Sequence, residues 1–195
     1  MGKTSTSTEP VSSYAEAMRE GVPFRHPDGA LEYPTMRSRP QAEFTLGPMY
    51  RLLLTGSLVV AACYSLWMLA RIPSMPEQVP MHFASDGSFN RYGSPWEMAG
   101  LAAVMSVMIA GCAVLTRYPR VFNFGATRVT GRNIQAHYKN GVQMMVWLVL
   151  SLTVLQIVMF GAIAGDWSMT PAVWFAMALI LGSMGFFIVR MLRIR

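Results

Sequence analysis

The sequence carries little charge for its length. Of its 195 residues, 13% are Asp, Glu, Lys or Arg, whereas a soluble domain carries about 25%. Hydrophobic residues make up 53%. This balance excludes a typical soluble enzyme, whose surface is covered by charged side chains. It also excludes a disordered chain, which combines low hydrophobicity with high charge.

Cysteine is scarce as well, and the motifs of common enzymes are missing. Cys63 and Cys112 stand alone in apolar runs, so we expect them to act as small apolar side chains and not as metal ligands. The sequence has no nucleophile elbow and no glycine-rich phosphate loop. We therefore predict a protein that is not an enzyme and has no cofactor.

Four long runs lack Asp, Glu, Lys, Arg and His. A helix needs roughly 17–25 mostly apolar residues to cross a bilayer, and the runs have that length: Leu52–Ala70, Met98–Leu115, Val142–Ala164 and Pro171–Val189. Helices of a soluble bundle would each show a polar face. The sequence therefore predicts an all-α, integral membrane four-helix bundle over residues 52–195. Thr153 and Gln156 are strongly polar residues within the third run, and we expect them to form interhelical hydrogen bonds.

The absence of ionisable residues from the runs also argues against a self-contained transporter, because transporters place such residues within the membrane. Lys and Arg number 14 in residues 1–51, 116–141 and 190–195, and two in the loops 71–97 and 165–170. Since cytoplasmic segments hold the excess of cations, both termini are predicted to be cytoplasmic. We expect the inner cations to face anionic lipid and not nucleic acid.

Residues 1–51 differ in composition from the rest of the chain. They hold six of the 12 prolines and six charges of each sign, and their apolar residues follow no period beyond a short turn at 14–20. A segment of this kind buries too little apolar surface to offset its ordering entropy. We predict a mostly disordered cytoplasmic tail, with a docking segment for a cytoplasmic partner as the alternative.

Two loops contain the residues to which a function can be assigned. In the loop 71–97, three prolines in the first half oppose a helix there, and four aromatic residues give the loop an apolar side. Glu77, His82 and Asp86 are weak candidates for a metal site, because a catalytic zinc needs three protein ligands. A structural role for His82, donating to a backbone carbonyl, is the simpler interpretation. In the inner loop 116–141, we expect His137 to be an interfacial anchor and not a base.

Both loops also carry a recognisable pattern. The run Met-Pro-Glu-Gln-Val-Pro-Met-His-Phe at 75–83, followed by Gly87 and Arg91-Tyr92-Gly93, resembles a bacterial membrane domain of unknown function found in SdpI-type immunity proteins. The second loop is similar to the Pro-x-x-Asn and Thr-x-x-Asn segment of that family. The residues of the motif are Pro76, Pro80, His82, Phe83, Gly87, Tyr92, Gly93, Pro119, Asn123, Asn133 and Tyr138. The resemblance extends over about residues 50–165.

The resemblance implies self-protection against a secreted toxin, and signalling. We therefore expect a non-enzymatic multi-pass protein of the bacterial cytoplasmic membrane that binds through the outer loop 71–97 and the basic inner loop 116–141. Its expected partners are the lipid bilayer, an extracytoplasmic peptide or toxin, and a membrane or cytoplasmic protein. The alternatives are an accessory or regulatory subunit of a larger membrane complex and, third, a metal-dependent membrane enzyme.

Overall fold

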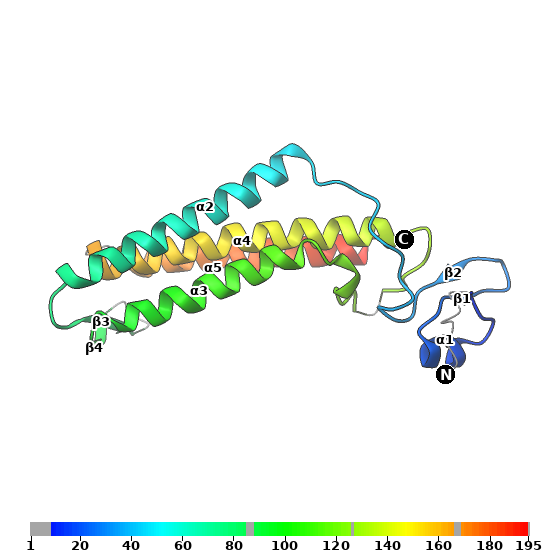
Figure 1. Cartoon of the computed structure of the whole chain (residues 1–195), viewed down its shortest axis with the longest axis horizontal. Helices are drawn as coiled ribbons and strands as arrows, with labels where there is room; N and C mark the ends of the chain where they lie inside the picture. Colours follow the sequence, from blue (N-terminus) through cyan, green and yellow to red (C-terminus); the bar gives the residue numbers. More distant parts are fainter. Residues whose placement is uncertain (1–8, 85–87, 126, 166–168, 195) are drawn as a thin grey trace, which may run out of the picture. The chain divides into compact units, whose positions relative to one another are not determined.

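The computed structural model describes residues 9–84, 88–125, 127–165 and 169–194. Most of these residues are helical (Figure 1). The elements, in chain order, are α1 (Tyr14–Glu20), β1 (Phe24–Arg25), β2 (Leu31–Glu32), α2 (Pro48–Arg71), the short 3-10 helix η1 (Ile72–Ser74), β3 (Val79–Phe83), β4 (Phe89–Gly93), α3 (Glu97–Leu115), the 3-10 helix η2 (Pro119–Val121), α4 (Ile134–Gly165) and α5 (Met169–Leu192). The four-helix prediction is confirmed, since α2, α3, α4 and α5 are long and apolar enough to cross a membrane.

The chain divides into two compact units. The helix unit comprises residues 46–117 and 143–186, and the terminal unit comprises the described parts of residues 1–45, 118–142 and 187–195. The predicted boundary at residue 52 separated an N-terminal tail from everything that follows it. The structure instead groups segments from the start, the middle and the end of the chain.

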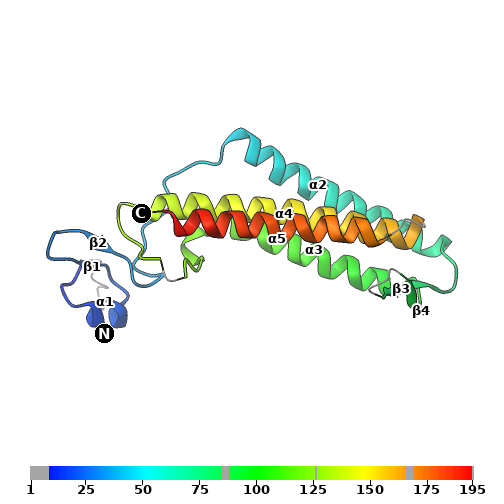
Figure 2. The same cartoon turned by 180° about the vertical axis from the view of Figure 1, so that it is seen from behind.

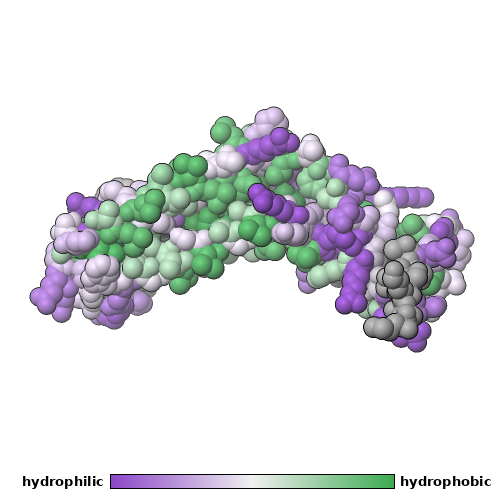
Figure 3. Space-filling view, viewed as in Figure 1, coloured by the Kyte–Doolittle hydropathy of each residue, from purple (hydrophilic) through white to green (hydrophobic). Residues whose placement is uncertain are grey.

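In the helix unit, α4 is the central helix. In its most apolar stretch, 61% of the residues are buried, compared with 22% in α2, 22% in α3 and 11% in α5. Figures 1 and 2 show α2, α3 and α5 running alongside α4. Large apolar side chains such as Leu66, Val107 and Leu181 point outward, and apolar residues cover the helices in the space-filling view (Figure 3). A lipid environment accounts for these exposed faces, because lipid tails solvate them and water does not.

Polar side chains join the helices at the centre of the helix unit. The Gln156 amide nitrogen of α4 donates to the Ser65 hydroxyl of α2 at 2.6 Å, and Ser65 pairs with Ser106 of α3 at 3.2 Å. The Thr153 hydroxyl lies 3.4 Å from the Ser57 carbonyl. The predicted interhelical bonds of Thr153 and Gln156 are thus confirmed. A hydrogen bond of this kind in a membrane contributes about 0.6 kcal/mol on average.

The start of α4 differs from its prediction. The helix begins at Ile134, eight residues before the apolar run that starts at Val142. Polar residues interrupt an apolar run in the sequence, but they do not end a helix. The Asn133 side-chain oxygen accepts the Thr130 N–H at 2.8 Å, and the Ile134 N–H donates to the Thr130 carbonyl at 3.0 Å. The first bond folds the turn that leads into α4, and the second gives the Ile134 N–H a partner, since a helix leaves its first N–H groups unpaired.

The described part of the N-terminal segment has a defined fold, although the sequence predicted mostly disorder. The short helix α1 is capped by Ser13 and ends at Gly21, whose φ of 72° suits glycine. Strands β1 and β2 form an antiparallel hairpin. Residues further along the segment contact the inner loop, as Tyr33 does through its N–H bond to the Val129 carbonyl at 2.8 Å. The ordering entropy is therefore offset by tertiary contacts that composition does not reveal.

Candidate functional site

The outer loop folds into a hairpin formed by β3 and β4. Its paired residues are Val79 and Gly93, Pro80 and Tyr92, His82 and Arg91, and Phe83 and Phe89, with irregularities on both sides of His82. Val79 is buried against α2, α3 and α4 in an apolar cluster, so the hairpin is attached to the helices at its base. Pro76, also part of the motif, is exposed just before β3. Gly87 and Asp86 lie outside the described residues.

Gly93 packs closely against the Glu97 side chain. A Cβ atom at Gly93 would collide with the Glu97 carboxylate and would lie 3.1 Å from the Met81 side chain. The same Glu97 carboxylate accepts a hydrogen bond from the Arg91 guanidinium at 2.9 Å. Because this ion pair is exposed to solvent, its contribution to stability is small. Its effect is to hold β4 against the first turn of α3.

His82 has a side-chain partner where the sequence analysis expected a backbone carbonyl. Its Nδ1 lies 2.5 Å from the Asn90 side-chain oxygen across the hairpin. With that oxygen as the acceptor, Nδ1 is the donor of this hydrogen bond. Glu77 is exposed. Within the described residues, no group of three His, Cys, Asp or Glu side chains is placed to hold a metal ion.

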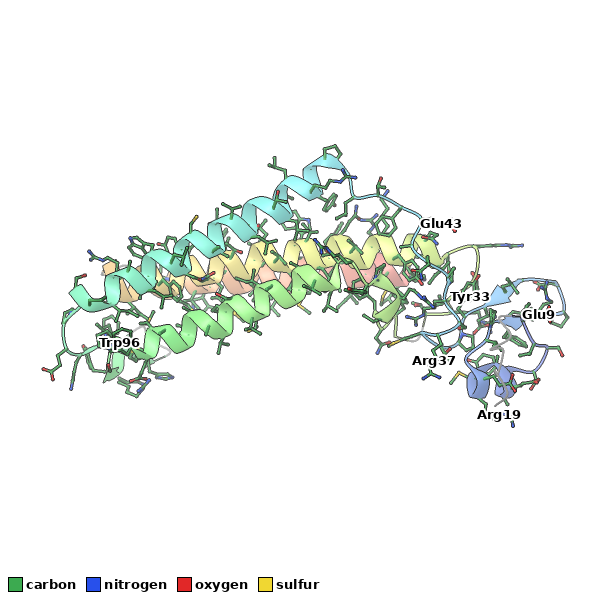
Figure 4. The ribbon with its side chains drawn as sticks, viewed as in Figure 1. Glu9, Arg19, Tyr33, Arg37, Glu43 and Trp96 are labelled. Carbon is green, nitrogen blue, oxygen red and sulfur yellow. The ribbon has the colours of Figure 1, made fainter. Side chains whose placement is uncertain are left out.

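Three aromatic side chains on the hairpin or just after it are exposed: Phe89, Tyr92 and Trp96. Their exposed fractions are 40%, 55% and 65%, and the Phe89 and Tyr92 rings lie 6.2 Å apart. Trp96 follows β4 at the start of α3 (Figure 4). Below the hairpin, a cavity of about 250 Å³ is lined by Met81 and His82 of β3 and by apolar residues of the helices, among them Leu101, Leu155, Met159 and Ile163.

In the terminal unit, one inner-loop motif residue contacts the N-terminal segment, and others form bonds within the loop itself. The Tyr138 ring is buried, and its hydroxyl donates to the Pro40 carbonyl at 2.9 Å. The Asn133 side-chain oxygen accepts the Thr130 N–H, and its amide nitrogen donates to the Arg128 carbonyl at 2.9 Å. Asn123 accepts the N–H of Gly125, whose φ is +60°. Pro119 is buried at the start of η2. All four residues therefore have structural roles.

Arg39 is the centre of the contact between the N-terminal segment and the inner loop, and no sequence pattern points to it. One of its terminal nitrogens donates to the Arg120 and Phe122 carbonyls at 2.8 and 2.7 Å. Its guanidinium carbon lies 4.9 Å from the centre of the Phe124 ring. Burial lowers the pKa of Arg39, while the nearby Tyr138 opposes that shift. Burial, and secondarily Glu43, raises the pKa of Tyr33 in the same region.

His137 is fully buried, so it is not the interfacial anchor that the sequence predicted. Its ring lies 5.1 Å from that of Phe124, and neither ring nitrogen has a hydrogen-bond partner among the described residues. Asn140, one turn further along α4, donates to the Phe187 carbonyl at 2.9 Å. Close packing continues at Gly141, where a Cβ atom would lie 2.5 Å from the Phe122 ring.

Comparison with known proteins finds a family match that covers parts of α2 and α3 and the hairpin between them. Residues 58–106 match a family described as "Domain of unknown function (DUF1648)". An uncharacterized protein of Archaeoglobus fulgidus is 34% identical over 82 residues, which cover 38% of this chain and 45% of that protein. The chain thus spans under half the length of this relative. No solved structure matches the chain.

The family match supports the coarser part of the predicted resemblance. It includes the whole outer-loop motif from Pro76 to Gly93, so this motif lies within a domain of unknown function, as the sequence analysis expected. The match ends at residue 106, short of the second loop, whereas the expected resemblance extended to about residue 165. The chain is a multi-pass membrane protein by the length and composition of its helices, and it contains this domain match.

Proposed function

We propose that this chain is a non-enzymatic protein of the bacterial cytoplasmic membrane that acts by binding an extracytoplasmic peptide with its outer hairpin. The observation that carries the proposal is the exposure of Phe89 and Tyr92, on a hairpin attached at its base, and of Trp96 just after it. Tyr, Trp and Arg supply most of the binding energy at protein interfaces. A fixed hairpin also loses little entropy when it binds.

The chemistry of the site favours an apolar peptide. The aromatic rings offer apolar contact area, and the cavity of about 250 Å³ beneath the hairpin is large enough for an apolar side chain. Arg91, paired with Glu97, leaves the hairpin with little net charge at this point. Together with the resemblance to SdpI-type proteins, these features support a role in immunity against a secreted peptide toxin. This proposal places the hairpin outside the cell and both termini in the cytoplasm.

The proposal is tested by survival and by a matched pair of tryptophan variants. A strain that lacks the protein should lose viability in co-culture with a toxin-producing strain, and expression of the wild-type chain should restore it. Trp96→Ala should fail to restore it, whereas Trp174→Ala should restore it fully. Trp174 is a suitable control because its exposed fraction, 67%, is close to the 65% of Trp96, and it lies on α5. Equal survival with and without the protein contradicts the immunity role.

The second candidate is an accessory or regulatory subunit of a larger membrane complex. The folded terminal unit supports it, because its inner loop holds cations with no acidic residue between positions 116 and 141. Such a surface is suited to an acidic partner protein in the cytoplasm. In-membrane crosslinking followed by gentle purification should then recover a partner in stoichiometric amount. Recovery of the chain alone contradicts the subunit role.

A further inference from the structure

A groove of about 740 Å³ lies within the terminal unit. Three segments form its walls, namely the turn between β1 and β2, the inner loop just before α4, and the end of α5. The residues on which the argument depends are Asp28, Thr130, Arg128, Arg132, Leu192 and Ile194. One wall therefore carries cations and a hydroxyl group, and another carries aliphatic side chains.

Each acidic side chain at the groove has a hydrogen-bond partner within the terminal unit. The Asp28 carboxylate accepts the Ala30 N–H at 3.0 Å within its own turn. The Glu32 carboxylate, next to the groove, binds the His26 ring at 2.8 Å and the Nε of Arg128 at 3.4 Å. Because Arg128 uses Nε for this contact, its terminal nitrogens remain available. Arg132 is exposed, and it forms no ion pair with any described residue.

The aliphatic wall lies at the expected boundary of the membrane. Leu192 is the last residue of α5 and the end of its apolar span, which runs from Pro171 to Leu192. Its side chain is 62% exposed. At the end of a span, the hydrocarbon core gives way to the layer of lipid headgroups. Ile194 lines the groove two residues further on.

We infer that this groove binds one anionic phospholipid. The phosphate contacts Arg128 and Arg132, and the upper part of an acyl chain lies against Leu192 and Ile194. Guanidinium groups bind phosphate with strong, charge-assisted hydrogen bonds. Basic pockets beside the ends of membrane helices bind anionic headgroups for the same reason. A soluble phosphate would use the arginines and leave the aliphatic wall unused, so the complementary occupant is a lipid.

The test is a lipid titration followed by native mass spectrometry of the full-length chain in detergent. The wild-type chain should retain one molecule of dioleoyl phosphatidylglycerol and bind dioleoyl phosphatidylcholine at least about tenfold more weakly, which corresponds to about 1.4 kcal/mol. Arg132→Gln should weaken retention of phosphatidylglycerol about tenfold. The matched control is Arg117→Gln, an exposed arginine at the end of α3 that does not line the groove, and it should change retention less than about twofold.

Two further arms separate the lipid from a soluble phosphate. Leu192→Ser should weaken retention of phosphatidylglycerol several-fold, and glycerol phosphate in solution should not displace the lipid. The inference is overturned if both lipids bind equally, or if Arg132→Gln and Arg117→Gln cause the same loss. It is also overturned if glycerol phosphate displaces the lipid while Leu192→Ser has no effect, because the groove would then be a site for a soluble phosphate.

Discussion

Removal of the Arg39 side chain should release the N-terminal segment from the inner loop. The guanidinium donates to two carbonyls at 2.8 and 2.7 Å and lies over the Phe124 ring. A hydrogen bond from a charged donor contributes about 1.5–3 kcal/mol and a cation–π contact about 0.5–1 kcal/mol. Desolvation of the buried guanidinium offsets part of this sum. We therefore expect Arg39→Ala to reduce the free energy of opening of this contact by about 3 kcal/mol.

Hydrogen exchange in lipid nanodiscs measures this opening directly. The Tyr33 N–H, which is bonded to the Val129 carbonyl, reports on the contact. A loss of about 3 kcal/mol should accelerate its exchange about 100-fold. Arg37→Ala is the control, because it removes an exposed side chain. It keeps the Arg37 carbonyl, which accepts a hydrogen bond from Arg120. Equal exchange rates in the two variants would refute the role of Arg39.

Three further predictions concern packing, polar contacts and ionisation. Gly141→Ala should lower the free energy of unfolding in detergent by about 1–3 kcal/mol, because the new Cβ atom meets the Phe122 ring. The control is Gly182→Ala, whose Cβ atom meets no atom within 4 Å. It should leave the melting temperature nearly unchanged. Gln156→Met should change the free energy of unfolding by under about 1 kcal/mol. The variant loses the hydrogen bond to Ser65, but it also removes a buried side-chain oxygen that has no partner among the described residues. Burial raises the pKa of Tyr33, so the terminal unit should lose stability as the pH rises above about 10, the usual pKa of tyrosine. Thermal melts measured over a range of pH should show a smaller loss for Tyr33→Phe.

The membrane helices could be predicted because lipid imposes a simple condition on sequence. A spanning helix must be long and uncharged, and the run Leu52–Ala70 meets that condition without any knowledge of its neighbours. Gln156 was predictable for the complementary reason, since a polar side chain within a span requires a partner. The polar first turns of α4 were missed, because His137 and Asn140 interrupt the hydropathy while continuing the helix.

The candidate site was only partly predictable. Gly93 and His82 were selected by resemblance to a pattern, and the structure supplies the physical reasons: a glutamate beside one and an asparagine across the hairpin from the other. The strand pairing was not predicted, because prolines such as Pro80 argue against regular structure, although an outer strand tolerates them. Arg39 was not predictable, since its partners lie 81 and 83 residues away in the chain.

Labelling of single cysteines in intact cells tests the central claim, that the hairpin faces the exterior and the terminal unit faces the cytoplasm. In a background with Cys63→Ala and Cys112→Ala, a cysteine replaces either Gln78, at the base of the hairpin, or Gln41, in the N-terminal segment, and both residues are exposed. A membrane-impermeant maleimide should label Gln78→Cys in intact cells and Gln41→Cys only after lysis. Labelling of Gln41→Cys in intact cells, with protection of Gln78→Cys, would contradict the account.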